Sequence, residues 1–167
     1  MRTPLSRLVA AGIVTAITDG LFASVQSLLR GSTVTRLWQG VAAVPLGPKA
    51  LEGGTKTAFI GVGLHICVAF FWSAVFLFAL MRSQWLRNVV ASRGGIFKVA
   101  AVYGPAIWMF MSLIVIPAFL HRPPSITSRW WVQFFGHMIF VALPIVGIMS
   151  MDSGLLIEPA HPAVDRT

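Results

Sequence analysis

The stretch TAFIGVGLHICVAFFWSAVFLFALM, residues 57–81, decides the class of this protein. It contains no acidic residue, no lysine and no arginine. A helix needs about 20 apolar residues to cross the hydrocarbon of a bilayer, and this run is long enough. His65 lies inside it. A titratable side chain at such a depth is unfavourable in lipid, so we expect the rest of the chain to supply it with a partner.

Three further apolar runs cover about residues 5–29, 95–120 and 130–151. A spanning segment must satisfy its own backbone hydrogen bonds, which predicts helices. Hydrophobic residues make up 56% of the 167 residues and charged residues 11%, whereas a soluble domain carries about 25% charged residues. The sequence therefore predicts an all-α integral membrane domain over residues 1–151, with four transmembrane helices in an antiparallel bundle.

The first connection contains a shorter apolar pattern. Val34, Leu37, Val41 and Val44 recur at helical spacing. This segment is too short to span a bilayer, so we predict a short interfacial helix at about residues 33–44. Residues 152–167 contain prolines and acids without periodicity, which predicts a loose C-terminal tail.

The formal net charge is +8. The basic residues lie mostly between the apolar runs, where they would meet lipid headgroups rather than nucleic acid. Trp130 and Trp131 are typical of an aromatic belt at headgroup level. The basic residues divide almost evenly between the two sides of the membrane. The second connection, residues 82–95, is the most densely basic, which favours cytoplasmic N- and C-termini.

Three titratable side chains at membrane depth are predicted to form one polar layer. Asp19, His65 and His137 fall at similar depths on three helices, because a helix rises about 1.5 Å per residue. Trp108 and Ser112 reach the same level from the third span. Small residues beside His65 allow neighbouring helices to approach, so we expect the layer to face the bundle axis.

Three interpretations of this layer remain open. In the first, the polar groups satisfy one another and fix the register of the helices. His65 and His137 could instead be ligands of a haem or pigment. The layer could also carry protons or a small solute, with histidine and aspartate as titrating stations.

The sequence contains no constellation typical of catalysis. No Ser-His-Asp or Cys-His arrangement and no zinc-protease motif is present, so we expect no catalytic residue, no metal site and no enzyme activity. Cys67 is the single cysteine, which excludes an internal disulfide, and we expect it to be buried as a small apolar side chain. Pro105 and Pro144 lie inside predicted spans and predict helix kinks.

Several motifs resemble a known group of proteins. The stretches TDGLFA, LWQGVAA, GGTKTAFIGVGLHICVAFFWSAVF, YGPAIWMFMSLIVIPAF and GHMIFVALPIVG, within residues 18–147, are similar to those of small bacterial inner-membrane proteins of the YagU-like type. The resemblance implies a four-helix integral membrane protein of the bacterial inner membrane, without an agreed biochemical activity.

The sequence therefore favours a non-enzymatic structural or accessory subunit of a membrane assembly. Its expected partners are the lipid bilayer and either a homo-oligomer or a larger membrane complex. The alternatives are a small proton-linked transporter or channel, and a haem or pigment binder that uses His65 and His137.

Overall fold

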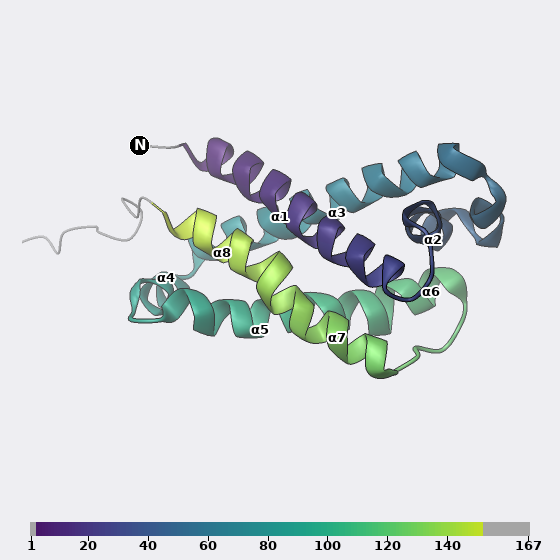
Figure 1. The fold of residues 1–167 in the computed structure, drawn as a ribbon. Helices are drawn as coiled ribbons and strands as arrows, with labels where there is room; N and C mark the ends of the chain where they lie inside the picture. The colour runs from purple at the N-terminus through teal and green to yellow at the C-terminus, as the bar shows by residue number, and fades with distance from the viewer. Residues whose placement is uncertain (1–2, 152–167) are drawn as a thin grey trace, which may run out of the picture.

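The computed structural model describes residues 3–151, so the predicted loose tail, residues 152–167, lies outside the described residues. Four long helical rods dominate the fold (Figure 1). The first two are α1 (Pro4–Leu28) and α3 (Gly54–Arg82). The third joins α5 (Gly95–Phe110), η2 (Met111–Val115) and α6 (Ile116–Leu120), and the fourth joins α7 (Ser128–His137), η3 (Met138–Ala142) and α8 (Leu143–Ser150).

Each of the four rods is long and apolar enough to cross a membrane, and no strand occurs among residues 3–151. This confirms the prediction of an all-helical chain with four candidate spans. Successive rods run in opposite directions (Figure 1). The start of α1, the end of α8 and α4 (Gln84–Ala91) lie at one end of the molecule, and α2 (Val34–Leu46) and α6 lie at the other.

The shorter helices begin at polar caps. The Thr33 hydroxyl accepts a hydrogen bond from the backbone N–H of Arg36 at the start of α2. The Ser83 hydroxyl accepts one from Leu86 and so begins α4, which was not predicted. Such caps satisfy backbone donors that the first helical turn leaves free.

Two spans contain a π-helical segment directly before a proline. The η2 segment ends two residues before Pro117, and η3 ends two residues before Pro144. The backbone N–H that follows each segment donates to the carbonyl five residues back. Proline has no N–H and collides with the carbonyl four residues earlier, so it opens the regular ladder. At Pro105, by contrast, α5 remains an uninterrupted α-helix.

The apolar core occupies the half of the bundle nearer the chain ends. It is formed by buried side chains of α1, α3, α4, α5, η3 and α8, which include Ala11, Phe76, Leu80, Val90, Ala100, Ile107, Val141, Ile145, Val146 and Met149. Bulky aliphatic packing therefore holds this end together, and the polar residues lie toward α2.

Two glycines allow helices to touch through their backbones. A Cβ atom on Gly61 would overlap the carbonyl oxygen of Trp38, and one on Gly104 would overlap the backbone of His137. Small residues at helix crossings are the usual device for close packing in membrane bundles. Gly61 thus seats α2 on α3, and Gly104 seats α7 on α5.

The α2 helix packs mainly on α3 and also contacts α1. The Gln39 side chain donates to the Gly54 carbonyl at 3.0 Å, and Arg36 donates to the Leu51 carbonyl at 2.8 Å. These bonds hold α2 and the following 3₁₀ turn η1 (Pro48–Glu52) across the end of the α1–α3 pair.

The prediction that Cys67 is buried is wrong, because its side chain is exposed on the outside of α3.

Candidate functional site

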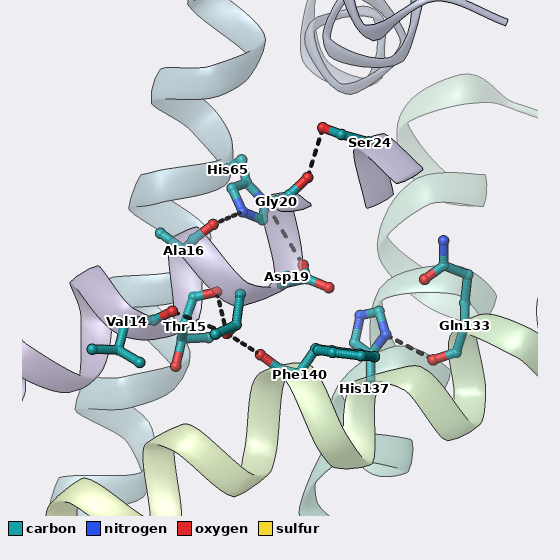
Figure 2. Close-up of polar contacts among 11 residues, drawn as sticks. Val14, Thr15, Ala16, Asp19, Gly20, Ser24, His65, Gln133, His137 and Phe140 are labelled. Atoms are coloured by element: carbon teal, nitrogen blue, oxygen red, sulfur yellow. Dashed lines mark hydrogen bonds and ion pairs between the residues drawn. The ribbon is translucent and has the colours of Figure 1, made fainter. Parts of the chain in front are cut away.

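His65 and Asp19 form the centre of the polar layer. His65 projects from α3 and Asp19 from α1, with 3.9 Å between His65 Nδ1 and Asp19 Oδ2 (Figure 2). The Nε2 atom of His65 lies 3.1 Å from the Ala16 carbonyl oxygen. A carbonyl can only accept, so Nε2 carries a hydrogen and donates it to Ala16. The Nδ1 atom of His65 then faces the Asp19 carboxylate.

The contact between His65 and Asp19 is electrostatic, because 3.9 Å is longer than a hydrogen bond. A neutral His65 would direct the Nδ1 lone pair at the carboxylate, and two acceptors do not attract each other. A proton on either Nδ1 or Asp19 turns the contact into an ion pair or a donor–acceptor pair. The side chains of His65 and Asp19 are only 15% and 16% exposed, so water screens them little.

The α2 helix covers His65, a contact that the sequence analysis did not predict. The Trp38 ring lies over the His65 ring, with 5.1 Å between the ring centroids. Gly20 of α1 completes this wall, since a Cβ atom on it would lie 3.4 Å from the Trp38 ring and 3.5 Å from His65 Nε2. Trp38 was missed because only tertiary packing brings residue 38 to residue 65.

His137 lies beside this pair on α7. Its Nδ1 lies 2.8 Å from the Gln133 carbonyl oxygen, so Nδ1 donates and Nε2 is left with the lone pair. Figure 2 shows the Asp19 carboxylate between the two histidines. Asp19 and His65 both lie within electrostatic range of His137. The structure therefore brings the three predicted titratable side chains together.

Trp108 joins the layer, whereas Ser112 makes a different contact. The Trp108 ring packs against His137, with 4.9 Å between the ring centroids. The Ser112 hydroxyl instead accepts a hydrogen bond of 2.9 Å from the indole N–H of Trp130. Trp130 is buried, so its assignment to a headgroup belt is wrong, while its neighbour Trp131 is half exposed. An inward-facing serine supplies the acceptor that this indole needs.

A second contact between α1 and the last span involves Thr18. Its hydroxyl lies 2.6 Å from the Phe140 carbonyl oxygen, nearer than the carbonyl oxygens of Val14 and Thr15 in its own helix at 2.9 and 3.3 Å. We assign the single hydroxyl hydrogen to Phe140, the nearest acceptor. In a regular helix the N–H of residue 144 would donate to this carbonyl, but Pro144 has none. Thr18 was missed because its partner depends on a proline four residues beyond the acceptor.

Several buried polar atoms of the layer have no hydrogen-bond partner within residues 3–151. They are Asp19 Oδ1, Thr15 Oγ1 and Trp108 Nε1. The Nε2 atom of His137 also makes no hydrogen bond to a described residue. The layer is thus incompletely paired around both Asp19 and His137.

The residues present do not fit a haem held by both histidines. His65 Nε2 is bonded to Ala16 and walled in by Trp38 and Gly20, and Nδ1 faces Asp19. Asp19 also lies between the two imidazole rings (Figure 2). No group of three His, Cys, Asp or Glu side chains in the described part of the chain could hold a metal ion.

No family model, curated protein or solved structure matches this chain. The helix packing and the polar layer are therefore the basis for the functional proposals.

Proposed function

We propose that this chain is a multi-pass, non-enzymatic integral membrane protein that serves as a structural or accessory subunit of a membrane assembly. The observation that carries the first part is the outward apolar surface. Only 17% to 44% of the residues in the apolar stretch of each rod are buried. Ile17, Phe71, Val102 and Phe135, one from each rod, are all more than half exposed. Lipid is the solvent that accommodates such a surface without loss of stability.

The distribution of charge supports the same proposal. Every lysine and arginine among residues 3–151 lies in a connection or near a helix end. Partial burial lowers the pKa of Arg30, and the charge of nearby Arg129 lowers it further. Two guanidinium groups so close together at one end would be stabilised by an anionic lipid headgroup. We place the end that contains the start of α1 and α4 in the cytoplasm of a bacterial cell, with the spans in its inner membrane.

The accessory role is favoured over catalysis because the described residues of the polar layer form no catalytic arrangement. His65 is bonded to the Ala16 carbonyl and contacts Asp19, and residues 3–151 show no nucleophile–base pair beside it. Extraction from native membranes in mild detergent, followed by sizing and mass spectrometry, should recover a homo-oligomer or a larger complex. A monomer without associated proteins would refute the accessory role.

A second candidate function is proton-linked transport, which the clustering of His65, Asp19 and His137 favours. The His65–Asp19 contact lies beside His137, a second imidazole whose Nε2 makes no hydrogen bond to a described residue. Imidazole and carboxylate groups at membrane depth are typical of proton relays.

Proteoliposomes with an internal pH-sensitive dye test this candidate. The wild-type chain should speed the decay of an imposed pH gradient, and Asp19→Asn should abolish the effect. Glu52→Gln is the matched control, because Glu52 and Asp19 are the two acidic residues in the described chain and Glu52 is exposed in η1. Decay no faster than in empty liposomes would refute the proton-linked function.

A further inference from the structure

We infer that the polar layer contains a binding site for one water molecule between Asp19, His137 and Trp108. The starting observation is the set of polar atoms that residues 3–151 leave unpaired. Asp19 Oδ1 and Trp108 Nε1 are buried without a hydrogen-bond partner, and His137 Nε2 has none either. Buried polar atoms in native proteins are almost always bonded, either to protein or to ordered water.

These atoms belong to side chains that meet around His137. The Trp108 ring packs on the imidazole at 4.9 Å between centroids. The Asp19 carboxylate lies on the side of His137 that faces His65 (Figure 2). His137 itself is 9% exposed, so solvent outside the bundle scarcely reaches it. Its Nδ1 is fixed on Gln133, which holds the ring in one orientation.

The chemistry of the three atoms selects the ligand. Asp19 Oδ2 is the oxygen that faces His65, so Oδ1 is the carboxylate oxygen left to accept a hydrogen bond. His137 Nε2 accepts because Nδ1 is the donor, and Trp108 Nε1 can only donate. A water molecule matches this set, since it donates two hydrogen bonds and accepts one. A metal cation or ammonium ion does not match, because the indole N–H would direct its positive end at the ion.

This inference extends the proton-linked candidate by naming the group that would connect Asp19 to His137. The two are tested separately, because a bound water does not require proton flux. It is equally compatible with an accessory subunit, in which the water would close the remaining hydrogen bonds of the layer.

Water-edited solid-state NMR of protein with ¹⁵N-labelled imidazoles tests the site. The protein is reconstituted in phosphatidylcholine–phosphatidylglycerol bilayers, and magnetisation is transferred from water to the ring nitrogens. His121, which is exposed in the third connection, is the positive control for water contact. The His137 signal is assigned by its loss in His137→Asn.

We expect a water cross-peak at His137 Nε2 that a membrane-impermeant relaxation agent does not quench, although the agent quenches the His121 peak. Trp108→Phe removes the indole donor and should abolish the His137 cross-peak. Trp72→Phe is the matched control. It also removes an unpaired indole N–H, but Trp72 packs on Tyr103 and Phe110, away from the histidines. It should leave the cross-peak intact.

The absence of a water cross-peak at His137 in the wild-type protein would overturn the site. A peak that the relaxation agent quenches together with that of His121 would overturn it as well, because bulk solvent would then be its source. Neither result would bear on the oligomer measurement or the liposome assay, so the water site can fail while either proposed function stands.

Discussion

The Thr18 hydroxyl provides the sharpest test of how the last span is held against α1. Thr18→Val keeps the branched shape and removes the donor to the Phe140 carbonyl. Interhelical hydrogen bonds in membrane proteins contribute about 0.6 kcal/mol on average and at most about 1.7. The bond here is short, and its acceptor has lost its usual donor to Pro144. We therefore expect a loss near the upper limit, about 1.5 kcal/mol, which is about a tenfold change in the unfolding equilibrium.

The same reasoning predicts coupling between Thr18 and Pro144. Pro144→Ala restores an N–H four residues after Phe140, and this donor can satisfy the carbonyl without Thr18. In that background, Thr18→Val should lower the free energy of unfolding by only about 0.5 kcal/mol, a coupling energy of about 1 kcal/mol. SDS titration of the protein in mixed micelles, followed by circular dichroism, measures all four stabilities.

Thr15→Val is the matched control for this cycle. It makes the same change one turn earlier in α1, but the Thr15 hydroxyl has no hydrogen-bond partner in the described residues. Its removal should leave stability unchanged or slightly increased, because a buried unpaired hydroxyl is unfavourable. The reasoning would be refuted if Thr18→Val destabilised the protein equally in both backgrounds, or no more than Thr15→Val.

Two further predictions concern packing and topology. Gly61→Ala forces a methyl group onto the Trp38 backbone and should lower the free energy of unfolding by about 1–3 kcal/mol. Gly63 has no neighbouring atom near its Cβ position, so Gly63→Ala should instead stabilise α3 by up to about 1 kcal/mol. Equal SDS-unfolding midpoints for the two variants would contradict the proposed close contact. Topology can be tested with single-cysteine variants in a Cys67→Ser background. A membrane-impermeant maleimide added to intact cells should label Ser32→Cys, at the α2 end, and should not label Ser92→Cys, at the α4 end. The reverse labelling pattern would show that the proposed orientation is wrong.

The helices could be predicted from the sequence because the length and hydropathy of a segment do not depend on how the chain folds. The predicted span at about residues 57–81 compares with Gly54–Arg82 in the structure, and the predicted helix at about residues 33–44 compares with Val34–Leu46. Both depend on apolar residues and their spacing, which are local properties of the sequence. The same local reasoning placed Asp19, His65 and His137 at one depth, because rise per residue converts sequence position into height.

The partners of these side chains were less predictable because they depend on rotation and crossing of the helices. Ser112 was placed in the layer by depth, yet it bonds Trp130. Trp130 was assigned to the membrane surface by its position at a helix start, yet it points inward. The π-helical segments before Pro117 and Pro144 shift the faces of both spans, and a fixed helical period does not represent such a shift.

The length of α3 has a consequence for the choice of membrane. At about 1.5 Å per residue its 29 residues extend about 43 Å, while bilayer hydrocarbon is about 30 Å thick. In the proposed membrane-spanning arrangement, this mismatch would make α3 either lean in the bilayer or carry its first turns beyond the hydrocarbon, where α2 packs on Gly61. Because the packing of α2 on α3 holds Trp38 against His65, a thicker bilayer would place both side chains deeper below the membrane surface. Lipid chain length would then tune how far the polar layer lies from the aqueous phase.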